Sequence, residues 1–151
     1  MKRPGFTVIE LIVVILIIGL LSLIAIVGMR NSQIGSRDAK RVAELHQMSQ
    51  AVELFFNEHL ALPTGASGWC TYVSNPTYPQ FINDIQPYMA QVPRDPKLPN
   101  QVGDYFFDNI DSAAGKYGLC ATMEKATGKS YDYSACAGGA IYNYCIFPNG
   151  Q

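Results

Sequence analysis

The chain has 151 residues, of which 48% are hydrophobic and 15% are charged, and its formal net charge at pH 7 is -1. Nucleic-acid-binding domains usually carry a clear excess of Lys and Arg, so this balance argues against a dedicated nucleic-acid surface. A chain of this length has room for one small domain beyond a long helix, and its four cysteines are available to stabilise that domain.

A long apolar run lies close to the start of the chain. Between Leu11 and Met29, only two glycines and one serine interrupt the Leu, Ile, Val, Ala and Met residues. About 20 such residues in a helix cross a hydrocarbon core of about 30 Å, so the run predicts a membrane-spanning helix. Glu10 stands at the beginning of this segment. A carboxylate is unfavourable in a spanning helix, which indicates that Glu10 has a functional role and an unidentified partner.

The residues around Glu10 resemble the class III signal of type IV prepilins and type II secretion pseudopilins. The similarity rests on a basic leader that ends in glycine, with Lys2, Arg3 and Gly5, followed by Phe6 and by Glu10 ahead of the apolar run. It implies that a membrane-embedded prepilin peptidase cuts between Gly5 and Phe6 and methylates the new amine of Phe6. It also implies that Glu10 pairs with the Phe6 amine of a neighbouring subunit during filament assembly. An ordinary signal anchor has similar hydropathy but does not explain these residues together.

The segment after the apolar run has one-sided periodicity. Apolar residues recur at steps of three or four between Arg37 and His59, which predicts an amphipathic helix packed on the protein's own sheet. The spacings of Lys40 with Glu44 and of Asp38 with Arg41 predict ion pairs on a solvated face. Weak helix formers between residues 28 and 36 predict a kink or a break at that point.

The remainder of the chain reads as a small, loop-rich domain. Pro63 ends the helix, and the many prolines up to residue 103 predict a connection containing a short helix around Pro79 to Tyr88. Aromatic and β-branched runs predict three antiparallel strands, at residues 105–107, 116–123 and 141–147. The end of the amphipathic segment and the Pro-x-Asp-Pro turn at residues 93–96 resemble major pseudopilins.

The expected fold is therefore α+β, with a long N-terminal helix packed on a small C-terminal antiparallel sheet, as in the pilin fold that the resemblance implies. The expected divisions are a leader peptide (1–5), a transmembrane or filament-core helix (6–29), an amphipathic stalk (30–60) and a globular β head (61–151). The resemblance further implies a bacterial inner-membrane protein that crosses the membrane once, with its head outside the cytoplasm, and that later joins a pilus or pseudopilus filament.

The four cysteines lie in the part expected outside the cytoplasm, where disulfides form readily. If residues 116–123 and 141–147 are antiparallel neighbours, Cys120 faces Cys145, and this leaves Cys70 to pair with Cys136. The main alternative pairs Cys136 with Cys145 and Cys70 with Cys120. A register slip of one residue would turn Cys120 or Cys145 to the opposite face, so the sequence leaves both pairings open.

No catalytic constellation is evident, so we expect a structural protein rather than an enzyme, with no cofactor. Several major pseudopilins bind calcium in a C-terminal loop, but the spacing of Asp104, Asp108 and Asp111 does not match an EF-hand loop, and calcium is not expected. The implied partners are further copies of the chain, other pilins or pseudopilins, prepilin peptidase, an inner-membrane assembly platform and membrane lipid. The alternative function is a minor pilin with an adhesive or DNA-binding head that uses Trp69, Tyr72 and Tyr78.

Overall fold

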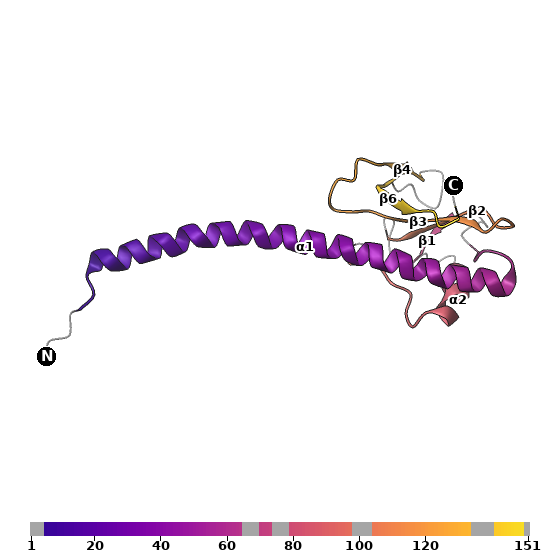
Figure 1. The fold of residues 1–151 in the computed structure, drawn as a ribbon, viewed down its shortest axis with the longest axis horizontal. Coiled ribbons are helices and arrows are strands. Elements are labelled where there is room, and N and C mark those ends of the chain that lie inside the picture. Colours follow the sequence, from indigo (N-terminus) through magenta and orange to yellow (C-terminus); the bar gives the residue numbers. More distant parts are fainter. Residues whose placement is uncertain (1–4, 65–69, 74–78, 98–103, 134–140, 150–151) are drawn as a thin grey trace. The chain divides into compact units, whose positions relative to one another are not determined.

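The computed structural model describes residues 5–64, 70–73, 79–97, 104–133 and 141–149, and it gives only the backbone at residues 24–28 and at Cys70. The chain divides into two compact units, Met1–Ser36 and Arg37–Gln151. Figure 1 labels most of the helices and strands, and the boundary between the units falls inside the long helix α1.

Helix α1 runs from Val8 to His59 without interruption. The predicted break between residues 28 and 36 is therefore wrong, because the helix continues through all of them. Each weak helix former costs at most about 1 kcal/mol, and strong helix formers on both sides keep the hydrogen-bond ladder intact. Among the described residues, no helix combines the length and apolar character needed to cross a membrane.

The second unit contains a four-stranded antiparallel sheet. Its strands are β1 (Cys70–Tyr72), β2 (Phe106–Asp111), β3 (Lys116–Ala121) and β6 (Tyr144–Ile146), in the spatial order β1-β2-β3-β6. A separate ladder pairs β4 (Tyr131–Asp132) with β5 (Ile141–Tyr142). Between β2 and β3 the chain turns at Gly115, whose φ of 66° suits glycine, and the Phe56 ring lies 3.0 Å from the place of a Cβ there.

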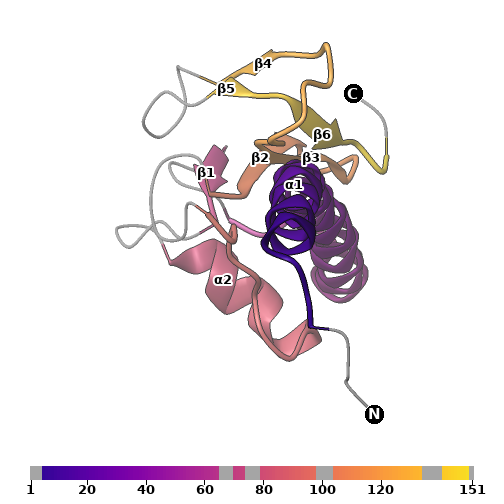
Figure 2. The ribbon, with the colours of Figure 1, turned by 90° about the vertical axis from the view of Figure 1, so that its left-hand side faces the viewer.

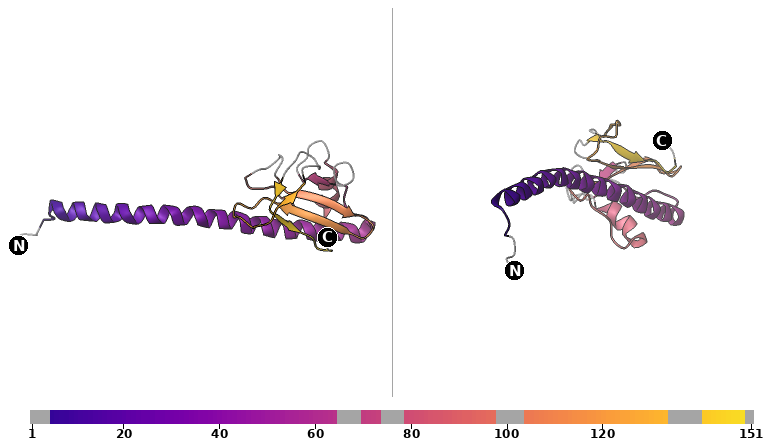
Figure 3. Two further views of the ribbon diagram at one scale, coloured as in Figure 1. Left: turned by 90° about the horizontal axis from the view of Figure 1, so that it is seen from above. Right: turned by 60° about the vertical axis from the view of Figure 1, so that its left-hand side comes forward.

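The core of the second unit lies between the sheet and the second half of α1, as predicted. Leu45, Met48 and Val52 of α1 are fully buried with Phe107 and Leu119 of the sheet. Figures 1 and 2 show this half of α1 with the sheet along one side and helix α2 (Gln80–Ile85) along another. Figure 3 shows strands of the sheet lying over the same part of α1.

The predicted short helix around Pro79 to Tyr88 is confirmed as α2 followed by the 3-10 turn η2 (Gln86–Tyr88). Phe81 of α2 packs against Phe107 of β2 with ring centroids 4.5 Å apart, so the connection contributes to the core. Strand β1 lies within the region that the sequence predicted to be loop. It is three residues long, too short for a periodic signal.

The last predicted strand, residues 141–147, is divided into β5 and β6 at Asn143. The backbone amide of Met123 donates to Asn143 Oδ1 at 2.6 Å, and Asn143 Nδ2 donates to the Met123 carbonyl at 2.9 Å. Because these two side-chain bonds satisfy the backbone of Met123, β3 ends at Ala121 and the last strand changes partner from β4 to β3.

Candidate functional site

The predicted site residues Gly5, Phe6 and Glu10 lie together at the start of the first unit. Gly5 and Phe6 precede α1, and among the described residues beyond its two neighbours none has an atom within 4 Å of the place where a Cβ on Gly5 would stand. The Phe6 side chain is 82% exposed. The described side chains therefore leave the bond between Gly5 and Phe6 accessible, which is what the predicted cleavage requires.

Glu10 caps the helix in which it stands. The backbone amide of Thr7 donates to Glu10 Oε2 at 2.9 Å, and the Thr7 hydroxyl donates to the same oxygen at 2.6 Å. In return, the Glu10 amide approaches Thr7 Oγ1 at 3.4 Å. This is a capping box, in which Thr7 is the N-cap and Glu10 is the third helical residue. The sequence interpretation missed it, although the Thr-x-x-Glu spacing was a readable signal.

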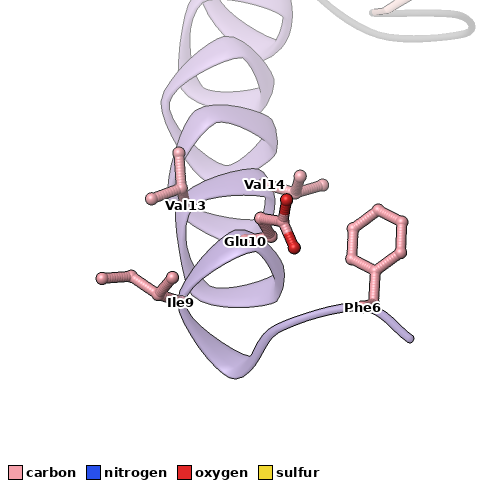
Figure 4. Close-up of a pocket in the computed structure, with 5 residues that line it drawn as sticks. All are labelled: Phe6, Ile9, Glu10, Val13 and Val14. Atoms are coloured by element: carbon pink, nitrogen blue, oxygen red, sulfur yellow. The ribbon is translucent and has the colours of Figure 1, made fainter. Parts of the chain in front are cut away.

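An open hollow of about 340 Å³ lies beside this cap, lined by Phe6, Ile9, Glu10, Val13 and Val14. Figure 4 shows the Glu10 carboxylate on the side of the helix that faces Phe6. The large apolar side chains from Val8 to Leu23 are likewise exposed. An apolar surface of this extent is typical of a contact with other helices or with lipid.

In the second unit, α1 is held by a network of charges that links three segments distant in sequence. Arg41 is only 1% exposed and donates to both oxygens of Asp95, at 2.6 and 3.1 Å. It also donates to Asp38 at 2.8 Å and to Glu124 at 3.1 Å. Arg37 binds Glu124 through two nitrogens, at 2.5 and 2.8 Å. These bonds fix the Pro-x-Asp-Pro turn and the segment after β3 on α1.

Both predicted ion pairs on α1 are present, Lys40 with Glu44 at 3.6 Å and Asp38 with Arg41 at 2.8 Å. The prediction that Arg41 lies on a solvated face is wrong, because Asp95 and Glu124 cover it.

The network shifts the pKa values of its members. Burial by itself lowers the pKa of Arg41, but its bonds to Asp95, Glu124 and Asp38 raise the pKa above its ordinary value. The Arg37 bond holds the pKa of Glu124 at about 2, against the opposing effect of burial, with further help from Arg41 and Lys97.

Three acids of α1 each accept a tyrosine hydroxyl from the rest of the second unit. Tyr105 donates to Glu44, Tyr117 donates to Glu53 at 2.9 Å, and Tyr88 donates to Glu58. Burial, followed by the bond to Glu44, raises the pKa of Tyr105. The stalk acids are therefore attachment points for the head as well as surface charges.

Cys120 and Cys145 form a disulfide between β3 and β6, with their Cα atoms 4.1 Å apart. The cross-strand prediction is confirmed for this pair, and the alternative pairing of Cys145 with Cys136 is excluded. The predicted partner pair, Cys70 with Cys136, lies outside the described residues, since Cys136 is not described and only the backbone of Cys70 is.

The three aspartates considered for calcium are separately engaged. Asp104 accepts from the amides of Asp95 and Tyr105, and Asp111 accepts from two amides of its own turn. Burial raises the pKa of Asp108, partly offset by a bond from Tyr133. Within the described ranges, no three His, Cys, Asp or Glu side chains gather as metal ligands would.

Of the aromatic residues proposed for an adhesive head, Tyr72 is half-buried and packs on the cluster around Phe106, Cys120 and Tyr142. Trp69 and Tyr78 lie outside the described residues. The described part of the head therefore offers no observation that favours the adhesive alternative.

Comparison with known proteins supports the interpretation of the N-terminus. Residues 1–26 match the model of the prokaryotic N-terminal methylation motif. The chain is similar to the type II secretion system core protein G of three bacteria. It is 26% identical to the Vibrio cholerae protein over 96 residues, covering 63% of this chain and 66% of the relative. It is 27% identical to the Escherichia coli K12 protein over 97 residues, covering 63% and 67%.

The match to the Aeromonas hydrophila protein is longer, at 26% identity over 126 residues, and covers 76% of this chain and 87% of the relative. The matched region thus spans about two thirds of the first two relatives and most of the third. No solved structure matches the chain. The methylation motif, the long helix packed on an antiparallel sheet and these relatives agree with one another, and together they make the chain similar to type II secretion pseudopilins.

Proposed function

We propose that this chain is a structural subunit of a type II secretion pseudopilus. The observation that carries the proposal is the N-terminal site, where Glu10 stands beside Phe6 at the start of a helix whose apolar side chains are exposed. The similarity to three core G proteins favours the pseudopilus over a type IV pilus. The function is assembly, and it requires no catalytic residue in this chain.

Before assembly, the proposal places the helix of residues 6–29 in the bacterial inner membrane, with the head outside the cytoplasm. Prepilin peptidase cuts between Gly5 and Phe6 and methylates the new amine. The exposed position of Phe6 and the empty surroundings of Gly5 support this step. An inner-membrane assembly platform then receives the processed subunit and adds it to the filament.

During assembly, the carboxylate of Glu10 pairs with the Phe6 amine of a neighbouring copy. Opposite charges attract more strongly where water is excluded, so the pair guides a new subunit to its position in the filament. The apolar side chains from Val8 to Leu23 then pack against those of neighbouring helices in the filament core.

The capping box gives this proposal a sharp test. Glu10→Gln keeps the acceptor oxygen of the capping box but removes the charge, whereas Glu10→Ala removes both. We expect both variants to be processed at Phe6, which mass spectrometry of the mature chain will show. Both should fail to form sedimentable filaments when produced with the assembly machinery.

Thr7→Ala is the matched control, because it removes the hydroxyl of the cap and keeps the charge of Glu10. Its filament yield should exceed that of Glu10→Gln. Normal filaments from Glu10→Gln would show that the cap, and not the charge, is what the subunit needs from this residue. An unprocessed Met1 in a host that contains the peptidase would overturn the assignment of the cleavage site.

A further inference from the structure

The charges of the second unit are segregated along the chain. From Val42 to Pro93 there is no Lys or Arg, while acids stand at Glu44, Glu53, Glu58 and Asp84. On α1, the residues just before this segment include Arg37, Lys40 and Arg41. The part of α1 in the second unit is therefore cationic at its beginning and acidic toward its end.

The acidic end carries an open hollow of about 380 Å³ between the end of α1 and the α2–η2 segment, lined in part by Phe55, Glu58, His59, Asp84 and Tyr88. The Phe55 ring stacks on His59, with centroids 4.1 Å apart, and meets Tyr88 edge to face. The hollow therefore combines aromatic rings with two carboxylates.

Both carboxylates are held in place and keep one oxygen available. Asp84 Oδ2 accepts from the amide and the hydroxyl of Thr64, each at 2.9 Å. Glu58 Oε2 accepts from Tyr88. Within the described residues, Glu58 Oε1 and Asp84 Oδ1 accept no hydrogen bond. Aromatic rings beside available carboxylate oxygens favour a cationic side chain such as lysine.

Leu60, which adjoins this hollow in sequence, adds a second observation. It directly follows α1, is 78% exposed and has a φ of 54°. A side chain other than glycine is strained in this conformation, and a leucine exposed to this extent is unfavourable in water. Leu54 is exposed as well. Backbone strain of this kind is found mainly at functional surfaces, which agrees with a partner at this end of the unit.

We propose that this hollow receives Lys40 of a second copy of the chain, in a head-to-tail contact between subunits. The Lys40 side chain is 58% exposed, and Glu44 holds it only at 3.6 Å. Lys40 and Glu58 are eighteen positions apart, which is five turns of α-helix or about 27 Å along α1. A copy displaced by about that distance along α1 has its Lys40 level with the acidic hollow.

This contact joins two different surfaces of the chain, the surface that carries Lys40 and the acidic hollow. Each subunit in a row can therefore bind one neighbour through Lys40 and another through its hollow. A heterologous contact of this kind repeats without closing and produces a filament. The inference rests on the proposed function, because it identifies the contact between heads in the proposed pseudopilus. It does not depend on Glu10, which acts in the other unit.

The test is a charge swap in the full-length chain, with sedimentable filament as the readout. Lys40→Glu and Glu58→Lys should each lower the yield at least tenfold, and the double variant Lys40→Glu with Glu58→Lys should restore most of it. Lys129→Glu is the matched control, because it makes the same charge change at an exposed residue after β3 and should leave the yield unchanged. Thermal unfolding checks that each variant is folded.

A crosslinking arm keeps the test decisive if a charge variant does not fold. Lys40→Cys and Glu58→Cys chains, produced together, should give a dimer with a short bismaleimide that neither chain gives alone. Single variants with normal yield, a swap without rescue, or no mixed dimer in assembled filaments would each overturn the Lys40 contact. If the wild-type chain itself forms no filament, the proposed function fails first.

Discussion

Replacing Arg41 by alanine tests whether the buried charge network holds the stalk to the head. Arg41 makes four hydrogen bonds to the carboxylates of Asp38, Asp95 and Glu124. Asp95 is as deeply buried as Arg41, at 1% exposed. Arg41→Ala leaves the Asp95 carboxylate in the interior without its main counter-charge.

Removing one partner of a buried ion pair typically costs about 3 to 5 kcal/mol. A domain of this size has a free energy of unfolding of about 5 to 15 kcal/mol, so the loss is a large part of the total. We expect the melting temperature to fall by about 10 to 20 °C, on the basis of a few degrees per kcal/mol. The tyrosines packed in the second unit give a near-ultraviolet circular dichroism signal that follows its unfolding in the detergent-solubilised full-length protein.

Lys40→Ala is the matched control on the adjacent position. Its ion pair with Glu44 is exposed and 3.6 Å long, so its loss should cost about 0.5 kcal/mol or less. The double variant Arg41→Ala with Asp95→Ala should be less destabilised than the sum of the two single variants, because the buried Asp95 carboxylate is then removed together with its main counter-charge. If Arg41→Ala unfolds within about 1 kcal/mol of the wild type, the network is not what holds the head on α1.

Three further predictions concern the second unit. Because the folded-state pKa of Glu124 is lowered to about 2 from 4.5, its contribution to stability is complete above pH 4.5 and is lost as the pH falls toward 2. The difference in melting temperature between the wild type and Glu124→Gln should therefore shrink over that range, and a constant difference would contradict the assigned shift. The Cys120–Cys145 bond closes a loop with a sequence separation of 25, so replacing both cysteines by alanine should lower the free energy of unfolding in denaturant by about 2 to 4 kcal/mol. An unchanged unfolding midpoint would show that the bond does not constrain the unfolded chain. A Cβ on Gly118 would lie 2.8 Å from the Phe147 ring, so Gly118→Ala should cost about 1 to 3 kcal/mol and displace Phe147. Gly128→Ser is strained by the φ of 70° at that turn but has no described neighbour within 4 Å beyond its adjacent residues, so it should leave the NMR signals of Phe147 unchanged.

Helical periodicity predicted the packing of the stalk because its information is local. Leu45, Met48 and Val52 recur at steps of three or four, and the structure buries them against the sheet. The Cys120–Cys145 bond was one of the two pairings that the sequence left open, since each cysteine lies inside a predicted strand and one register of the two strands sets the cysteines face to face.

The role of Arg41 was not accessible to the same reasoning. Its predicted partner, Asp38, is three positions away, but Asp95 and Glu124 are 54 and 83 positions away. No periodic pattern links residues at such separations, so a local interpretation placed Arg41 on a solvated face. The division of the last strand at Asn143 had the same cause, because the side chain that interrupts the strand bonds to Met123, 20 positions earlier.

Glu10 shows how one carboxylate serves both its own helix and a proposed neighbour. Both donors of Thr7 bind Oε2, and within the described residues Oε1 accepts no hydrogen bond. An amine from a neighbouring copy therefore has an acceptor oxygen without displacing the cap. Because Thr7 already fixes the orientation of the carboxylate, less side-chain freedom is lost when the amine binds. The cap therefore favours the proposed charge pair. Thr7, three positions before Glu10, orients the carboxylate that is proposed to bind the amine of a neighbouring subunit.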